Sequence, residues 1–336
     1  MLRLTEIDRK TWDEAISKHP EANFLQSWQY GDVQIAAGHA ALRYEISMDN
    51  IRIGIAQIII KNARRGRYME IAGGPLIDWN NHRLVAELVA CLRALGRENK
   101  CVFVRIRPQC DDDGALHTGL NRLGCRLSPM HVTADHTSIV DLTQSTEQLL
   151  ANMRQQTRYE IKRAPKRGIA VTKSESSSFI DEFYEVQSAT ARRQGFIPPS
   201  KRYLTALYEN FADHAKLYHA SKGDDLLNLA IIIRYGREAA YLEAASTDAA
   251  RREPGAYAII WQAIEDAKSD GLMRFNLWGI APPDSPNHRY AGVTTFKRGF
   301  GGQDIAYLAP HDIIVSPVRY QLNHIVESMR KKRRHL

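Results

Sequence analysis

The stretch Ile53–Lys61, IGIAQIIIK, returns later in the chain as Leu229–Tyr235, LAIIIRY, and this repetition decides the fold. Both are β-branched runs of the kind that forms buried strands. Around the first run the pattern predicts strand, strand, helix and strand over residues 42–48, 53–61, 83–97 and 101–106. Around the second run it predicts the same order over residues 216–220, 229–235, 257–268 and 273–278.

Equivalent positions in the two copies are separated by a nearly constant distance. Ile60 and Ile233 are 173 residues apart, and Phe103 and Phe275 are 172 apart. Two β-β-α-β copies indicate two similar α/β domains with mixed sheets, although chance similarity of short patterns stays an alternative. We expect domains at residues 1–143 and 144–312, followed at 313–336 by a C-terminal helix and a basic tail.

Composition fits this picture and narrows the class of partner. The 336 residues suit about two domains, and the net charge of +8 favours polyanions such as RNA or phosphorylated metabolites. Part of that charge lies in Arg330–Arg334, a run typical of a solvated tail. The four cysteines form no CxxC pair, so we expect reduced thiols. With neither a signal peptide nor an integral membrane span in the pattern, we expect a cytoplasmic protein.

A second basic group lies at the start of the second predicted domain. Ser145 with Gln148 fits a capping box, and the helix that it opens is expected to end before Pro165. Arg154, Arg158 and Lys162 recur every four residues and so share one side of that helix. This ridge is either a solvated face or a contact for a phosphate backbone.

Motifs for covalent or metal catalysis are missing from the sequence. It contains no GxSxG, HExxH, Walker loop or strand-coupled GxGxxG, and its histidines show no metal-ligand spacing. We therefore expect neither a cofactor nor a metal. The remaining chemistry is the positioning of two substrates with stabilisation of charge.

The β-β-α-β order resembles the GCN5-related N-acetyltransferases (GNAT), which bind the pyrophosphate of acetyl-CoA through a loop at a helix start. The nearest match to that loop is Arg252, Gly255 and Tyr257, with a bulky ring where the family has a small residue. An acyl-CoA-dependent N-acyltransferase therefore remains an alternative with an incomplete site.

Motifs along nearly the whole chain resemble the Fem-type aminoacyl-tRNA-dependent peptidyltransferases, which build peptidoglycan cross-bridges with two tandem GNAT-like domains. The matching stretches are Phe24–Trp28 with Gly31, Gly74-Pro75, Thr137–Gly168, Phe183-Tyr184, Thr190–Phe196, Tyr241, Trp261, Gly279 and Phe296–Gly302. The chain lacks the long helical arm of some relatives and so resembles the armless, FemX-like branch. The resemblance implies that the first domain and the interdomain groove bind a muropeptide, that the second domain holds the charged tRNA end, and that a helix at 316–329 packs on the first domain.

The resemblance also implies roles for individual residues on the tRNA side. Lys297 lies in TTFKRGFGG, whose glycines predict a loop. It matches the family lysine at the acyl centre, where it would stabilise an oxyanion or the departing ribose oxygen. Phe296 and Arg298 beside it would contact the tRNA, with Phe296 stacking on the terminal adenine unless it packs in the core. The ridge residues would contact the tRNA backbone.

On the acceptor side the family pattern is only partly kept. Tyr203 is retained, but Pro199 replaces the family arginine, so Lys201 or Arg202 would supply the cation for the acceptor's phosphates. Tyr241, Gln26 and Trp28 complete the substrate contacts that the resemblance implies. Where many relatives carry an acid this chain has Arg107-Pro108, and the following residues 111–113 are aspartates, so the identity of a general base stays open.

Together these observations predict an enzyme that transfers an amino acid from aminoacyl-tRNA to an amine of a peptidoglycan stem peptide. The acceptor can be UDP-linked or lipid-linked, and we expect a monomer. A non-catalytic tRNA-binding protein would explain the charge but not the duplication.

Overall fold

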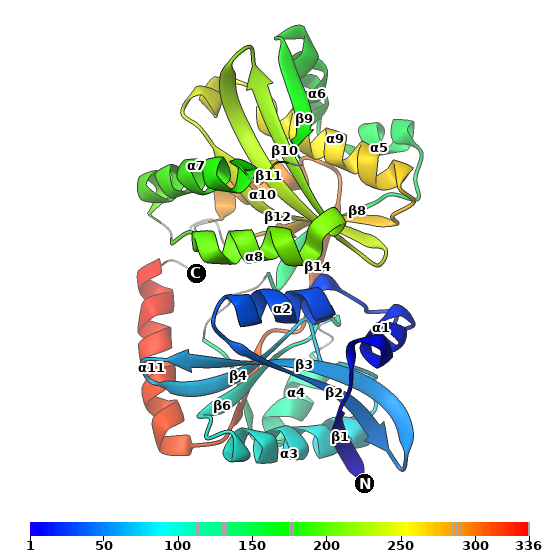
Figure 1. Cartoon of the computed structure of the whole chain (residues 1–336), viewed down its shortest axis with the longest axis vertical. Helices are drawn as coiled ribbons and strands as arrows, with labels where there is room; N and C mark the ends of the chain where they lie inside the picture. Colours follow the sequence, from blue (N-terminus) through cyan, green and yellow to red (C-terminus); the bar gives the residue numbers. More distant parts are fainter. Residues whose placement is uncertain are drawn as a thin grey trace. The chain divides into compact units, whose positions relative to one another are not determined.

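The computed structural model divides into two compact units, each built around its own sheet (Figure 1). It describes residues 1–111, 114–129, 134–174, 176, 178–195, 197–283, 285, 288 and 290–334. The first unit comprises residues 1–136, 281–291 and 305–336, and the second comprises 137–280 and 292–304.

The first unit contains a mixed sheet with helices on its faces. Its strands are β1 (Leu2–Glu6), β2 (Ala40–Met48), β3 (Ile51–Ala63), β4 (Gly66–Ala72), β5 (Leu76–Ile77), β6 (Phe103–Arg107), β7 (Cys125–Leu127) and β15 (His311–Ile314). They run in the order β1-β2-β3-β4-β6-β15-β7, with β5 against β3 and with β4 and β6 parallel. Its helices are α1 (Arg9–Ser17), α2 (Trp28–Ala36), α3 (His82–Glu98), α4 (Ala115–Arg122) and α11 (Pro317–Arg334), with a 3₁₀ turn η1 (Phe24–Gln26).

The second unit repeats this plan. Its strands are β8 (His136–Asp141), β9 (Ile169–Ser174), β10 (Ala215–Lys222), β11 (Asp225–Tyr235), β12 (Glu238–Ser246), β13 (Arg274–Gly279) and β14 (Gln303–Ala306). Their order is β14-β8-β13-β12-β11-β10-β9, with β12 and β13 parallel. Its helices are α5 (Thr146–Asn152), α6 (Gln155–Lys166), α7 (Ser178–Gln194), α8 (Lys201–Phe211), α9 (Gly255–Ser269) and α10 (Ala291–Arg298), with 3₁₀ turns η2 (Ala212–His214) and η3 (Ala249–Arg252).

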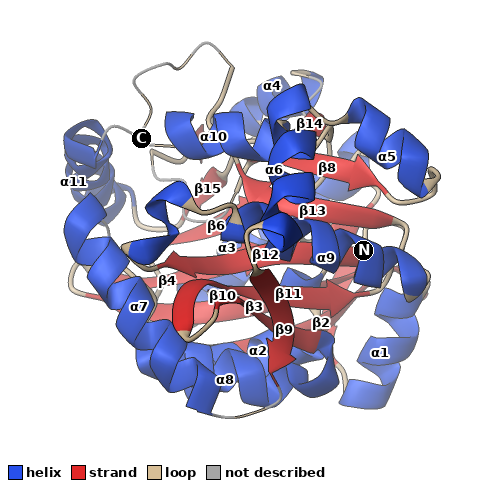
Figure 2. Cartoon of the chain, turned by 90° about the horizontal axis from the view of Figure 1, so that it is seen from above, coloured by secondary structure: helices blue, strands red, loops and turns tan. Residues whose placement is uncertain are grey.

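Each unit buries one long helix against its sheet, as the apolar spacing predicts. In the first unit Leu84, Leu88 and Leu92 of α3 join the core with Ile58 and Ile71 of the sheet. In the second unit the apolar side of α9 packs with strand residues from β11 and β13. Figure 2 shows the helices and strands of the chain from a second direction. The predicted mixed α/β architecture is confirmed.

The predicted order of the repeat omits one strand in each copy. The observed order is β-β-β-α-β, because β4 and β12 each continue from the preceding hairpin. These two strands pair in parallel with the strand that follows the long helix. The predicted order therefore lacks β4 in the first unit and β12 in the second.

Three further expectations need correction or placement. The helix opened by Ser145 is two helices, α5 and α6, separated at Met153 and Arg154, and Pro165 lies inside the last turn of α6. The basic residues 330–334 form the end of α11, where continued helix hydrogen bonding orders them, and are not a separate tail. Strand β8, which precedes the predicted boundary at Thr143, belongs to the second sheet, and β15 belongs to the first.

Candidate active site

In the second unit, the parallel pairing of β12 and β13 is short, and two ionisable side chains lie beyond the paired residues. The parallel register runs from Glu238↔Arg274 to Ala240↔Asn276. Just beyond it, the register of β12 against β11 shifts, so that Ile232 faces Tyr241 and Ile231 faces Glu243. At this irregularity Tyr241 packs in the core cluster with α9, whereas Glu243 accepts a hydrogen bond from Gln187 of α7.

Strand β13 is also irregular, at its end near Trp278. Trp278 adopts φ +60°, a left-handed conformation that costs a non-glycine residue on the order of 1–2 kcal/mol. Its N–H donates to Asn276 Oδ1 at 2.8 Å, and the register against β8 shifts between Asn276 and Gly279. The carbonyl of Gly279 accepts a hydrogen bond from Lys297 at 2.9 Å. The strained turn thus places a backbone acceptor opposite this lysine.

Lys297 is a buried cation. It lies in the last turn of α10, where the sequence predicted a loop, and its side chain is 8% exposed. Gly279 O is the hydrogen-bond partner of Nζ within the described part of the chain, and Nζ lies 6.0 Å from the ring centre of Tyr241. Burial lowers the pKa of Lys297 to about 8, although the charge of Glu243 opposes this shift. An ammonium with unused N–H groups in such a place can bind a developing anion.

Glu243 is the acid that faces this lysine electrostatically. Its Oε2 accepts a hydrogen bond from Gln187 Nε2 at 2.9 Å. Burial raises the pKa of Glu243 to about 7, and the hydrogen bond from Gln187 and the charge of Lys297 only partly offset that rise. Both groups therefore titrate near neutral pH, which is typical of acid–base catalysts. The sequence did not single out Glu243 or Gln187.

The glycine-rich segment after Lys297 has a packing role. A Cβ at Gly299 would lie 2.4 Å from Thr157 Oγ1, and one at Gly301, where φ is +76°, would lie 2.6 Å from Asn152 O. Arg154 N donates to Gly299 O at 2.9 Å. The glycines thus allow this segment to approach the junction of α5 and α6, which anchors the end of α10.

The predicted tRNA contacts next to Lys297 have partners within the unit. Phe296 packs edge-to-face on Tyr257 and Phe300, with ring centres 4.9 and 5.4 Å away. Arg298 forms an exposed ion pair with Asp304 at 2.6 Å. The structure therefore gives Phe296 the core alternative that the sequence left open.

The three residues of the basic ridge differ in what they contact. Arg158 donates to the carbonyls of Ala151 at 3.2 Å and of Met153, and so caps the end of α5. Arg154 is the N-cap residue of α6, and both it and Lys162 are exposed. Arg154 and Lys162 thus remain the candidates for a phosphate contact.

The predicted acceptor residues Lys201, Arg202 and Tyr203 form the first turn of α8. Ser200 caps this helix by accepting from Tyr203 N at 3.2 Å. Lys201 is exposed and pairs with Asp181 at 2.9 Å. Arg202 is exposed and Tyr203 is half-buried.

In the first unit, Gln26 and Trp28 support the fold. The buried Gln26 donates to Ala72 O at 2.8 Å and accepts from Gln57 N at 2.8 Å, which ties η1 to β3 and β4. Trp28 lies under the guanidinium of Arg43, 3.8 Å from its ring centre. These contacts give both residues a role in the fold, and their contact with a substrate stays a prediction.

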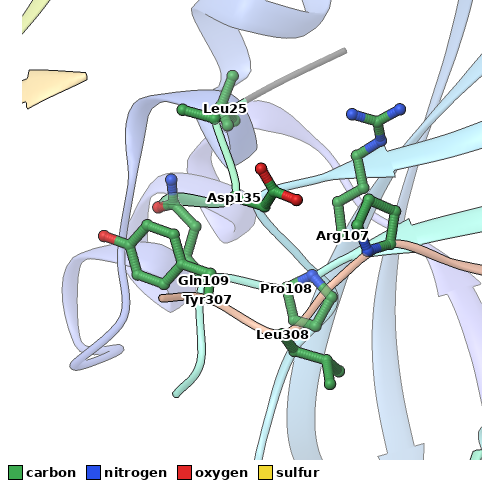
Figure 3. Close-up of a pocket in the computed structure, with 10 residues that line it drawn as sticks. Leu25, Arg107, Pro108, Gln109, Asp135, Tyr307 and Leu308 are labelled. Atoms are coloured by element: carbon green, nitrogen blue, oxygen red, sulfur yellow. The ribbon is translucent and has the colours of Figure 1, made fainter. Parts of the chain in front are cut away.

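The first unit also contains a charged centre beside a small pocket. Glu70 of β4 binds Lys61, and its Oε1 lies 3.0 Å from Arg107 Nε. Burial alone would raise the pKa of Glu70, but the charges of Lys61 and Arg107 outweigh it and hold this pKa at about 2. Figure 3 shows the pocket at the end of β6, where Arg107 and Asp135 supply its charged groups.

The place where a GNAT enzyme binds pyrophosphate is occupied by a carboxylate. Glu253, just before α9, pairs with Arg167 at 2.8 Å and with Lys222 at 2.9 Å. Tyr257 packs on Phe296. Because Glu253 already satisfies two cations and would repel phosphate, this helix start does not fit a CoA diphosphate.

Within the described residues no group of three or more His, Cys, Asp or Glu side chains is arranged to hold a metal ion. The four cysteines are free. Nor does any helix of the described part have the length and apolar character required to cross a bilayer.

Comparisons with known proteins agree with this architecture. Lipid II:glycine glycyltransferase of Staphylococcus aureus is 22% identical over 214 residues, which are 60% of this chain and 51% of that protein. The match thus spans about half the length of that relative. A crystal structure of FemX superposes with a TM-score of 0.81 at 17% identity, covering 95% of this chain and 99% of FemX.

A tandem GNAT protein from the clavulanic acid biosynthesis pathway superposes with a TM-score of 0.57 at 11% identity, over 93% of this chain and 98% of that one. The prediction of two GNAT-like units is therefore confirmed. The family model described as the FemAB family matches residues 7–223 and 218–328. These matches take in nearly the whole chain, which belongs to the FemAB family.

Proposed function

We propose that this protein transfers an amino acid from aminoacyl-tRNA to an amine of a peptidoglycan precursor, with Lys297 and Glu243 at the reacting centre. The family and the relative named lipid II:glycine glycyltransferase support transfer of an amino acid to a cell-wall precursor. The observation that carries the proposal is the arrangement of the buried Lys297, which donates to Gly279 O at 2.9 Å, and the half-buried Glu243, which accepts from Gln187 at 2.9 Å. The two groups interact electrostatically, and their pKa values of about 8 and about 7 both lie near neutrality.

The reaction needs one proton acceptor and one stabiliser of negative charge. An amine with a free pKa near 10.4 is protonated at pH 7 and must lose a proton before it attacks the ester carbonyl. Glu243 accepts that proton, while the Lys297 ammonium stabilises the oxyanion. The new N–C bond forms, the ester C–O bond breaks, and a proton is returned to the ribose oxygen that leaves.

The remaining residues have supporting roles in this proposal. Gln187 orients Glu243, and the Gly279 carbonyl orients Lys297. Arg154 and Lys162 contact the tRNA backbone, and Lys201, Arg202 and Tyr203 contact the acceptor. The cytoplasmic location and the monomeric state stay predictions.

A transfer assay tests the proposal. The protein is incubated with labelled aminoacyl-tRNAs and a muropeptide, and with acetyl-CoA as a parallel donor. We expect aminoacyl transfer and no acetyl transfer, because Glu253 occupies the diphosphate position. Acetyl transfer alone would assign the chain to the acyl-CoA enzymes, and tRNA binding without any transfer would make it a tRNA-binding protein.

A variant of Lys297 tests the reacting centre. Lys297→Met keeps the length of the side chain and removes the charge, so single-turnover transfer should slow about a hundredfold or more. Affinity for the donor should stay within a few-fold of the parent. Lys216→Met, in β10 of the same unit, is the matched control and should transfer normally. Parental rates for Lys297→Met would remove Lys297 from the mechanism.

A further inference from the structure

Helix α11 exposes a row of large apolar side chains that the fold does not use. Val318, Leu322, Ile325 and Met329 are 78%, 63%, 47% and 57% exposed. Their spacing of four, three and four residues places all four within about 60° of the helix circumference. We call these four residues the apolar stripe of α11.

The opposite side of α11 holds the helix on the first unit, where it runs crosswise to the strands of the sheet (Figure 1). Tyr320 is 2% exposed and donates to Asp312 Oδ2 at 3.1 Å. Glu327 accepts from Arg105 Nη2 at 2.8 Å, and Asn323 Oδ1 accepts from Arg65 Nε at 2.8 Å. Because these contacts fix the orientation of the helix, the apolar stripe faces outward.

The charge on this helix is as one-sided as its apolar surface. Its one acidic residue, Glu327, lies on the packed side and is bound to Arg105. The exposed residues Arg330, Lys332 and Arg333 follow the stripe, and Lys332 and Arg333 project on either side of it by helical geometry. The outward face of α11 is thus apolar over its length and cationic at its end.

We propose that the apolar stripe and these cations bind the surface of a membrane that contains anionic phospholipids. An apolar row bordered by Lys and Arg is the arrangement by which a helix lies in the plane of a membrane interface. Anionic headgroups attract the basic end, whereas a second copy of the chain carries the same net charge of +8 and offers no opposite charge. Charge complementarity therefore favours lipid over self-association.

This binding deepens the proposed function and rests on it in one respect. If the acceptor is a peptidoglycan precursor, a protein held flat on an anionic membrane meets the lipid-linked form of that precursor at high local concentration. We therefore infer that the lipid-linked form is the acceptor. Membrane binding itself needs neither tRNA nor acceptor, so it is measured separately from transfer.

Vesicle flotation tests the proposal with the full chain. Vesicles of phosphatidylcholine alone are compared with vesicles that also contain phosphatidylglycerol, at low and at raised salt. We expect binding to the anionic vesicles, about tenfold or more above phosphatidylcholine alone, and weaker binding as salt rises. No binding to anionic vesicles at low salt would overturn the proposal.

Variants separate the stripe from general surface effects. L322E/I325E should lose at least about tenfold in vesicle binding, and K332E/R333E should lose the preference for phosphatidylglycerol. Ile51→Glu, which changes a 69% exposed isoleucine in β3, should bind like the parent. Unchanged binding of L322E/I325E would overturn the proposal, and so would a parent dimer that these substitutions make monomeric.

A transfer assay then distinguishes the two proposals. With a soluble UDP-linked muropeptide, L322E/I325E should transfer at the parental rate, because the stripe belongs to the first unit and Lys297 to the second. With the lipid-linked acceptor in anionic vesicles the same variant should be slower. Loss of transfer with both acceptors in the parent would contradict the proposed function and leave vesicle binding unaffected. Equal rates with the lipid-linked acceptor would contradict the inferred acceptor.

Discussion

Glu70 of the first unit and Glu243 of the second lie on corresponding strands, β4 and β12, which each pair in parallel with the strand after the long helix. Glu70 binds two cations, Lys61 and Arg107. Glu243 has the neutral amide of Gln187 and a lysine that is itself buried. The pKa of Glu70 is about 2, and that of Glu243 is about 7.

The difference shows how one scaffold serves two purposes. In the first unit the buried charges compensate one another, so the cluster stabilises the fold and the carboxylate stays ionised. In the second unit burial is not compensated, so both Glu243 and Lys297 can gain or lose a proton near pH 7. Such uncompensated burial costs stability and is typical of reactive sites.

The largest expected effect is on stability, when Glu70 is removed from its cluster with Lys61 and Arg107. Glu70→Gln leaves the buried Arg107 and the half-buried Lys61 without their carboxylate, and should lower the free energy of unfolding by about 3–5 kcal/mol. Because the folded pKa of about 2 lies below the ordinary 4.5, the stability from Glu70 is present above pH 4.5 and is lost as the pH falls toward 2. Urea unfolding from pH 7 to pH 3 measures both.

The control for this comparison is an exposed ion pair. Glu45→Gln removes the partner of Arg52, whose side chain is 42% exposed, and should cost less than about 1 kcal/mol. Equal losses for Glu70→Gln and Glu45→Gln would show that the buried cluster does not carry the stability assigned to it.

The next effect concerns the uncompensated glutamate. Glu243→Gln should slow single-turnover transfer about a hundredfold, since a general base contributes on the order of 10²–10⁴. In the parent the rate should rise through about pH 7 as Glu243 ionises and fall above about pH 8 as Lys297 loses its charge. The Glu243→Gln variant should lose the increase in rate through about pH 7 and keep the decrease above about pH 8.

Glu182→Gln, an exposed position on α7, is the matched control and should keep both limbs of the pH profile. A Glu243→Gln variant with the parental rise would assign the proton acceptance to the substrate or to water.

The sequence was sufficient for the parts of the fold with strong periodicity. The helices expected at residues 83–97 and 257–268 are His82–Glu98 and Gly255–Ser269. Strand β12, EAAYLEAAS, was missed because alanine and glutamate favour helix, and hydrogen bonds from β11 and β13 override that preference. Glu243 lies on this missed strand.

A signal for Glu243 was nevertheless present. Glu243 follows Glu70 by 173 residues, the same separation as Ile60 and Ile233. The role of Lys297 came from family resemblance, whereas its burial depends on packing that no local pattern encodes. The glycines after it suggested a loop, but they begin where α10 ends.

A smaller effect, opposite in sign to that at Glu70, is expected for the stability of Lys297→Met. The folded pKa of about 8 lies below the ordinary 10.5, so stability that is present above pH 10.5 is lost as the pH falls through 8. At pH 7 the variant escapes a cost of about 3 kcal/mol and loses a hydrogen bond worth about 1 kcal/mol. We expect a net gain of about 1–2 kcal/mol in urea unfolding at pH 7. A loss of stability would mean that a carboxylate stabilises the charge of Lys297, as Glu70 stabilises that of Lys61.

The smallest effect concerns helix α6 of the second unit, which we propose contacts tRNA. Arg154 and Lys162 are exposed in the second unit, whereas Arg158 is engaged with the carbonyls of α5. If each of the two neutralises one phosphate, replacing both with Ala should reduce the slope of log affinity against log salt by about 1–2. Filter binding of charged tRNA measures this slope.

The matched control removes two exposed cations from the first unit, in Lys10→Ala/Arg97→Ala. Both double variants lose the same net charge, so an effect of overall charge would change the two slopes equally. A reduced slope confined to Arg154→Ala/Lys162→Ala would place the tRNA backbone on α6. Equal slopes in all three proteins would return these residues to the solvated-face alternative, and the tRNA contact would then have to be sought elsewhere in the chain.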